Sequence, residues 1–235
     1  MSGELDYIRE NVAGIRERVA RAAEKSGRRL EDINIIAVTK TVGLDRIERV
    51  LEEGILNLGE NRVQELLEKY DNIKRECRWH LIGHLQTNKV KYIVDKVAMI
   101  HSLDRLELAE EIQNRAQKAG RSIDVLVQVN VSGEESKFGI DSGQTLELVK
   151  KLSLLKNIKV KGLMTIAPFD GNPENIRYVF RGLHKIFIDI QQENIDNIDM
   201  AYLSMGMSND FETAIEEGAN MVRIGTSIFG NRQYK

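Results

Sequence analysis

The chain has 235 residues, and its 34 basic and 36 acidic side chains give a formal net charge of −2, which argues against nucleic acid or an anionic membrane surface as the main partner. The lone cysteine, Cys77, excludes an internal disulfide framework and a thiolate metal cluster, and it fits a reducing cytoplasm. The first residues lack the pattern of a secretory signal. The sequence also contains no run of about 18 apolar residues, the length needed to span a membrane.

The chain begins with a pattern typical of an amphipathic helix. Apolar residues recur every three or four positions and form one face, and Gly27 is the expected stop. The residues of this face are Leu5, Ile8, Val12, Ile15, Val19 and Ala22. The helix therefore has one side to bury against the rest of the protein.

Short apolar runs then alternate with longer amphipathic segments. The runs predict strands at 33–39, 55–58, 79–82, 97–101, 123–129, 158–163, 199–203 and 220–224. The segments between them predict helices near 44–53, 60–70, 87–95, 104–119, 142–155, 173–192 and 209–217. This alternation is typical of parallel β–α–β units.

Eight such strands can close into a (β/α)8 barrel, also called a TIM barrel. The chain length fits one such domain over residues 1–235, with the first helix covering the gap left by a missing final helix. The alternative is an open doubly wound sheet, which would require a glycine-rich dinucleotide-binding turn after its first strand. Residues 39–43 (TKTVG) do not supply that turn.

Lys40 closes the first predicted strand, at the rim where barrels of this kind place their chemistry. A partly desolvated lysine loses its proton more easily, and its free amine can condense with a carbonyl group. The structural alternative is a lysine that extends to solvent or pairs with a carboxylate.

The turns after the last two strands are rich in glycine and hydroxyl groups. Gly206 and Gly225 would let the backbone approach a ligand, and Ser208 and Thr226 offer hydroxyls where barrels often bind phosphate. Ser208 could instead simply cap the helix predicted at 209–217.

Arg223 lies inside an apolar strand, so it must meet an acceptor or an anion. It would either form a salt bridge across the barrel interior or donate to a ring nitrogen or an anionic group of a ligand. The four histidines show no metal-binding spacing, and we expect most of them to be structural.

Five motifs make the chain resemble the pyridoxal phosphate homeostasis proteins, single-barrel relatives of the alanine racemase N-terminal domain. They are residues 37–40 (AVTK), 59–65 (GENRVQE), 79–89 (WHLIGHLQTNK), 203–208 (LSMGMS) and 222–230 (VRIGTSIFG). The resemblance covers nearly the whole chain. It departs from the family pattern at Leu58, where an aromatic residue is frequent, and at Thr39, where serine is common.

The resemblance implies an alanine racemase-like barrel that holds pyridoxal 5′-phosphate as a Schiff base on Lys40. By the same resemblance, Ser208, Gly225 and Thr226 would hold the phosphate. Arg223 would face the pyridine nitrogen, and Asn61 would lie beside the ring. No residue is assigned a catalytic role, and no metal is expected.

The function implied is intracellular homeostasis of this vitamin B6 cofactor, with little or no catalysis. We expect a cytoplasmic monomer or weak dimer whose partners are the cofactor and apo-enzymes that use it. The main alternative is a pyridoxal phosphate-dependent amino-acid racemase. A cofactor-free aldolase that forms its Schiff base through the same lysine and a pure interaction protein are two further alternatives.

Overall fold

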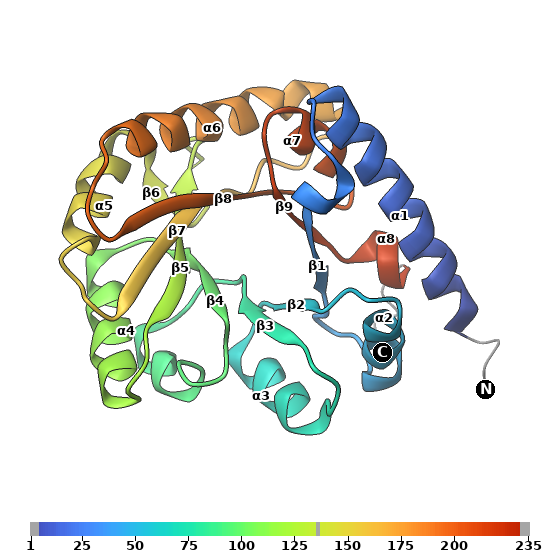
Figure 1. The fold of residues 1–235 in the computed structure, drawn as a ribbon, viewed down its shortest axis with the longest axis horizontal. Helices are drawn as coiled ribbons and strands as arrows, with labels where there is room; N and C mark the ends of the chain where they lie inside the picture. Colours follow the sequence, from blue (N-terminus) through green and yellow to red (C-terminus); the bar gives the residue numbers. More distant parts are fainter. Residues whose placement is uncertain (1–4, 135–136, 231–235) are drawn as a thin grey trace.

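The structure, a computed structural model, describes residues 5–134 and 137–230. Eight parallel strands form a closed barrel with helices around it (Figure 1). These strands are β1 (Asn34–Val38), β2 (Asn57–Glu60), β3 (Arg78–Leu81), β4 (Met99–Leu103), β5 (Ile123–Asn130), β7 (Ile158–Met164), β8 (Ile198–Met207) and β9 (Met221–Ile224). The fold is therefore the (β/α)8 barrel that the sequence predicts.

The barrel closes because the first and last strands pair. β1 lies between β2 and β9, with Val38 opposite Gly59 and Ala37 opposite Ile224. β4 pairs with β5 to complete the ring, and the two-residue strand β6 (Ile140–Asp141) pairs with the end of β5 outside it. Segments from both ends of the chain thus meet at β1.

The helices follow the predicted order, most of them with shorter limits. They are α1 (Asp6–Lys25), α2 (Leu44–Glu52), α3 (Val63–Asn72), α4 (Leu106–Lys118), α5 (Thr145–Leu152), α6 (Arg177–Gln192), α7 (Phe211–Glu216) and α8 (Thr226–Phe229). Helix α3 ends two residues later than predicted, and α8 was not predicted. The helix predicted at 87–95 is wrong in type, because Thr87–Tyr92 forms a 3-10 helix. Val90 within it and Ile93 directly after it are both buried and three residues apart, a spacing that suits three residues per turn.

Some strands continue beyond the predicted limits, which moves residues expected to follow the strands into the barrel wall. Glu60 ends β2 opposite Leu81 of β3, and Ser102 lies within β4. β8 runs on to Met207, so the turn predicted to start at Ser204 begins only at Ser208. Strand pairing, which a single segment does not reveal, sets these limits.

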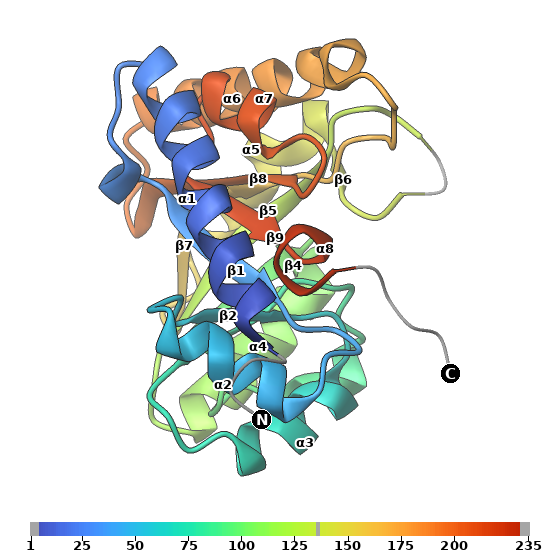
Figure 2. The ribbon, with the colours of Figure 1, turned by 90° about the vertical axis from the view of Figure 1, so that its right-hand side faces the viewer.

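Helix α1 covers one side of the barrel and packs against α2, α7 and α8 (Figure 2). Its predicted apolar face is buried except for Leu5, which precedes the helix and is half-buried. Gly27 follows the end of α1 with a φ of 72°, a conformation that favours glycine. The gap beside the last strand is therefore filled by α1 together with the short helix α8, which the sequence analysis did not predict.

The barrel interior changes from apolar to polar along the strands. Its apolar cluster consists of Ile36, Met99, Leu126, Met164 and Met221. Two residues further along, on the same face of β4 and β9, stand His101 and Arg223. The polar layer thus lies between this cluster and the carboxyl ends of the strands.

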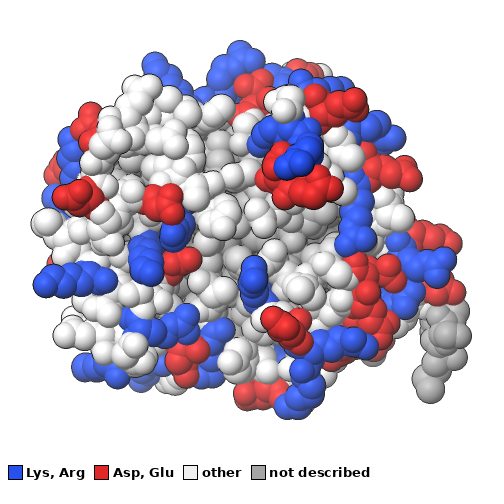
Figure 3. All heavy atoms as spheres, in the orientation of Figure 1, with Lys and Arg blue, Asp and Glu red and all other residues white. Residues whose placement is uncertain are grey.

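On the face seen in Figure 1, positive and negative side chains are interspersed, and neither sign forms a continuous patch (Figure 3). This mixture agrees with the small net charge. Within the described ranges, the structure contains no helix with both the length and the apolar character needed to cross a bilayer.

Candidate functional site

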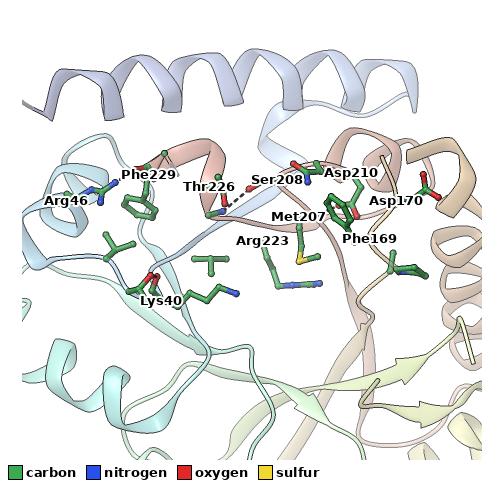
Figure 4. Close-up of a pocket in the computed structure, with 18 of the residues that line it drawn as sticks. Lys40, Arg46, Phe169, Asp170, Met207, Ser208, Asp210, Arg223, Thr226 and Phe229 are labelled. Atoms are coloured by element: carbon green, nitrogen blue, oxygen red, sulfur yellow. Dashed lines mark hydrogen bonds between the residues drawn. The ribbon is translucent and has the colours of Figure 1, made fainter. Parts of the chain in front are cut away.

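A cavity of about 800 Å³ opens at the carboxyl ends of β1, β8 and β9 (Figure 4). Segments from opposite ends of the sequence line it. The lining residues are Val38, Lys40–Gly43 and Arg46 at and after the end of β1, Ala167–Asp170 after β7, Met207–Asp210 at and after the end of β8, and Arg223, Gly225, Thr226, Phe229 and Gly230 at β9 and α8. The cavity occupies the position where (β/α)8 barrels build their active sites.

Lys40 lies two residues beyond the end of β1, and its half-buried side chain extends into the cavity (Figure 4). Because side chains alternate along a strand, Val38 and Lys40 face the cavity while Thr39 faces outward, where it is fully buried. The amine predicted to be reactive is therefore directed into the cavity.

A buried ion-pair cluster holds the backbone on both sides of Lys40. Lys69 of α3 donates to Glu60 Oε1 at 2.6 Å, to Glu65 Oε1 at 2.7 Å and to the carbonyl of Thr39 at 2.6 Å. The hydroxyl of Thr39 also donates to Glu60 Oε1, at 2.6 Å. On the other side of Lys40, the N–H of Thr41 donates to Glu65.

This cluster compensates for an unfavourable backbone turn. Thr41 has a φ of 62°, a region that β-branched residues rarely adopt. Glu60 is fully buried, and burial raises the pKa of its carboxyl group while Lys69 and Thr39 oppose that shift. The Glu60–Lys69 pair thus satisfies two buried charges and fixes the direction in which Lys40 leaves the strand.

Ser208 and Thr226 lie close together on the opposite side of the cavity from the Lys40 backbone (Figure 4). Ser208 Oγ accepts from the N–H groups of Gly225 at 3.2 Å and Ser227 at 3.3 Å, which joins the β8 turn to the start of α8. The alternative that Ser208 caps the following helix is wrong, because the residue before α7 is Asp210. The carboxylate of Asp210 accepts from the N–H of Met207 at 2.5 Å, and burial raises its pKa.

The two glycines singled out in these turns have different surroundings. Gly206 has a φ of 90°, and a Cβ there would lie 2.6 Å from Ala214 Cβ and 2.8 Å from Phe211 Cα. Its small size therefore lets α7 pack on β8, which corrects the expectation that it approaches a ligand. Gly225 does line the cavity.

Arg223 is almost fully buried at the cavity wall and is held by neutral acceptors. Its Nη1 donates to Ser204 Oγ at 2.7 Å and its Nη2 to the carbonyl of Thr165 at 2.8 Å. Burial lowers its pKa to about 10, with Asp210 opposing the shift, so the guanidinium remains charged at neutral pH. The salt bridge offered as a structural alternative is not present among the described side chains.

Like Gly206, Asn61 lies outside the set of residues that lines the cavity. Asn61 follows β2 and packs against Gly83. A Cβ added at Gly83 would lie 2.3 Å from the backbone carbonyl oxygen of Asn61. Its side-chain Oδ1 is buried and has no hydrogen-bond partner within the described part of the chain.

Other residues were missed or misplaced by the sequence analysis. The segment Ala167–Asp170 and Arg46 line the cavity, and only the nearby prolines, Pro168 and Pro173, indicated a loop in the first of these. His84 stacks on Phe138 with ring centroids 4.0 Å apart and is not among the lining residues. Ser102 is fully buried in β4.

Comparisons with known proteins agree with this geometry. The family model described as "Alanine racemase, N-terminal domain" matches residues 4–233. A pyridoxal phosphate homeostasis protein from Aquifex aeolicus is 48% identical over 226 residues, covering 96% of this chain and 98% of the relative. The solved structure of PipY from Synechococcus elongatus "with PLP bound" is 30% identical, with a TM-score of 0.83, and covers 95% of this chain and 100% of PipY.

A more distant likeness is to alanine racemase from Clostridium difficile, at 18% identity and a TM-score of 0.76, which covers 98% of this chain but 58% of the racemase. This likeness shows the fold alone. The chain belongs to the alanine racemase N-terminal domain family and, within it, to the pyridoxal phosphate homeostasis proteins.

The buried cluster behind Lys40 should contribute measurably to the free energy of unfolding. Lys69→Met removes the cation and leaves the buried Glu60 carboxylate without its charge partner, which should cost about 3–5 kcal/mol of the free energy of unfolding. Urea unfolding followed by circular dichroism measures this loss. The exposed Lys74 supplies the control, since Lys74→Met should change stability by less than about 0.5 kcal/mol. A loss for Lys69→Met no larger than that of the control would contradict the role given to the pair.

Proposed function

We propose that this protein binds pyridoxal 5′-phosphate through Lys40 and holds it in reserve, contributing to homeostasis of the cofactor inside the cell. The observation that carries the proposal is the placement of one lysine amine, one buried arginine and two hydroxyl groups around a single cavity (Figure 4). The names of the close relatives and the cofactor bound to PipY support it.

The lining residues fit the chemical groups of this cofactor. Its aldehyde can condense with the amine of Lys40, and its pyridine ring withdraws electrons. The hydroxyl groups of Ser208 and Thr226 are donors suited to a phosphate, and Gly225 lines the cavity beside them. These assignments keep Lys40 and the phosphate donors on different sides of the cavity.

In this proposal Arg223 donates to the pyridine nitrogen, and Asn61 lies beside the ring. Arg223 is already oriented by two acceptors and carries its charge into the cavity wall. An arginine at this nitrogen keeps it unprotonated, which weakens the ring as an electron sink. The buried and unpartnered Oδ1 of Asn61 is an acceptor that a ligand group could satisfy.

The composition of the cavity wall supports weak or absent catalysis. Racemisation needs an acid or base on each face of the substrate. The lining residues within the described ranges include neither a tyrosine nor a histidine. The two carboxylates, Asp170 and Asp210, accept from the N–H groups of Asn172 at 2.7 Å and Met207 at 2.5 Å. A racemase would therefore have Lys40 as one acid or base, but the described lining residues offer no second acid or base in a comparable position.

We propose a cytoplasmic protein that passes the cofactor to apo-enzymes and works as a monomer or weak dimer. The unpaired Cys77 supports a reducing compartment, and burial raises the pKa of its thiol to about 11, which keeps it protonated and unreactive.

The link to Lys40 can be tested by reduction and peptide mapping. Borohydride treatment of the protein loaded with pyridoxal 5′-phosphate should fix the cofactor on the peptide that contains Lys40. Lys40→Ala should abolish both this mass increase and the visible absorption band, with the circular dichroism spectrum unchanged. Recovery of the cofactor mass on Lys89 or Lys137 instead would show that the assignment is wrong.

The phosphate assignment predicts a selective loss of affinity. Replacing both hydroxyls, with Ser208→Ala and Thr226→Ala, should weaken binding of pyridoxal 5′-phosphate by at least about tenfold, because hydrogen bonds to a charged group are strong. Binding of pyridoxal, which lacks the phosphate, should hardly change. Ser153→Ala, at the end of α5, is a matched control. Equal affinity of the unaltered protein for the two vitamers would exclude a phosphate site here.

Weak catalysis predicts slow loss of the α-proton from bound amino acids. Alanine incubated with the loaded protein in heavy water should gain deuterium at Cα slowly. The rate should be far below typical enzyme turnover rates, which are roughly 1–10³ per second. NMR or mass spectrometry measures the incorporation, and Lys40→Ala supplies the blank. Exchange at enzymatic rates would favour the racemase alternative, while transfer of the cofactor to an apo-enzyme would support the carrier.

A further inference from the structure

A continuous line of hydrogen bonds crosses the barrel interior and ends at Arg223. His80 Nε2 lies 3.3 Å from Asn57 Oδ1, and His80 Nδ1 lies 3.0 Å from His101 Nε2. His101 Nδ1 lies 3.1 Å from Ser204 Oγ, which also accepts from Arg223 Nη1 at 2.7 Å. The line joins five strands: β2, β3, β4, β8 and β9.

Both histidines in this line are neutral. His101 is fully buried and His80 nearly so. Burial, with a smaller effect from Arg78, lowers the pKa of His80 to about 4. Burial, His80 and Arg223 together hold the pKa of His101 well below its usual value. Each ring therefore carries a single proton, on one of its two nitrogens.

The groups at the two ends of the line determine which nitrogen of each histidine carries the proton. Asn57 Oδ1 can only accept, so the proton of His80 is on Nε2 and its Nδ1 accepts from His101 Nε2–H. His101 Nδ1 must then accept, so the Ser204 hydroxyl donates to it. Arg223 can only donate, and Ser204 Oγ receives its N–H.

The reverse direction is unfavourable. If His101 Nδ1 carried the proton, Ser204 Oγ would accept from both His101 and Arg223. The hydroxyl hydrogen of this fully buried serine would then have no acceptor among the residues that the structure describes. A buried donor left without a partner costs more than a typical hydrogen bond contributes.

We propose that Ser204 and His101 are positioning residues that orient Arg223 toward the ring nitrogen of the bound cofactor. A hydroxyl that donates to His101 is polarised and becomes a stronger acceptor for Arg223. The carbonyl of Thr165 anchors the other terminal nitrogen, so two acceptors, one in β8 and one directly after β7, fix the plane of the guanidinium. Both acceptors are neutral, which leaves the positive charge to act on the cavity. This inference rests on the proposed function, because it assumes that Arg223 faces the pyridine nitrogen.

The first test needs no cofactor. NMR of the protein labelled with ¹⁵N-histidine identifies the protonated nitrogen of each ring at pH 7, with His80→Gln and His101→Gln used to assign the signals. We expect both His80 and His101 to be neutral with the proton on Nε2. His84 and His184 do not belong to the line and serve as internal references. A proton on Nδ1 of His101, or a charged ring, would overturn the proposed direction.

The second test links the line to Arg223. Affinity is measured for pyridoxal 5′-phosphate and for its analogue with C–H in place of the ring nitrogen, which cannot accept from an arginine. Ser204→Ala should reduce the preference for the natural cofactor by about tenfold, and Ser204→Thr, which keeps the hydroxyl, should restore it. Ser102→Ala is the matched control, because Ser102 is another fully buried serine and its hydroxyl has no hydrogen-bond partner in the described part of the barrel.

The outcomes separate this inference from the proposed function. An unchanged preference in Ser204→Ala, or a loss of the same size in Ser102→Ala, would overturn the positioning role while the protein still binds the cofactor. Equal affinity of the unaltered protein for the two compounds would overturn the role of Arg223 and the positioning role together. Failure of the unaltered protein to bind pyridoxal 5′-phosphate at all would refute the proposed function, and with it the role given to Ser204 and His101.

Discussion

The site depends on the buried pairing of Lys69 with Glu60 and Glu65, which fixes the chain on both sides of Lys40. Two charges removed from water need good geometry to be tolerated, and here one ammonium group satisfies two carboxylates and a backbone carbonyl within 2.7 Å. The turn at Thr41, with its positive φ, is held by one of these carboxylates, Glu65, which accepts from the N–H of Thr41. A reactive amine is useful only if its direction is fixed, and this cluster supplies that direction from outside the barrel wall.

The interior of the barrel makes a second contribution, from the opposite side of the cavity. An apolar layer excludes water from the centre, and the polar layer toward the strand ends is connected by hydrogen bonds rather than by ion pairs. In such surroundings a hydrogen bond is stronger and an unpartnered group is costly, so the orientations of His101, Ser204 and Arg223 depend on one another. Lys40 and Arg223 are thus held by separate networks on different strands, and the cavity lies between them.

Much of the fold followed from the sequence, because buried parallel strands are short apolar runs and the helices between them are amphipathic. The positions of Lys40, Ser208, Gly225, Thr226 and Arg223 around one cavity also followed, since strand ends of a barrel converge. The Glu60–Lys69 pair and the line through His80 and His101 were not predicted. They join residues on neighbouring elements whose register is set by strand pairing and helix packing. The expectation that most histidines are structural agrees with the hydrogen bonds of His80 and His101, although it did not identify their partners.

The central claim is that one cavity holds the cofactor through Lys40, with the phosphate and the ring nitrogen at opposite ends. A crystal structure of the protein with pyridoxal 5′-phosphate tests this most directly. The account predicts continuous electron density from Lys40 Nζ to the cofactor, the phosphate beside Ser208 and Thr226, and the ring nitrogen facing Arg223. Density for the cofactor elsewhere on the protein, or in this cavity with its phosphate turned toward Arg223, would contradict it.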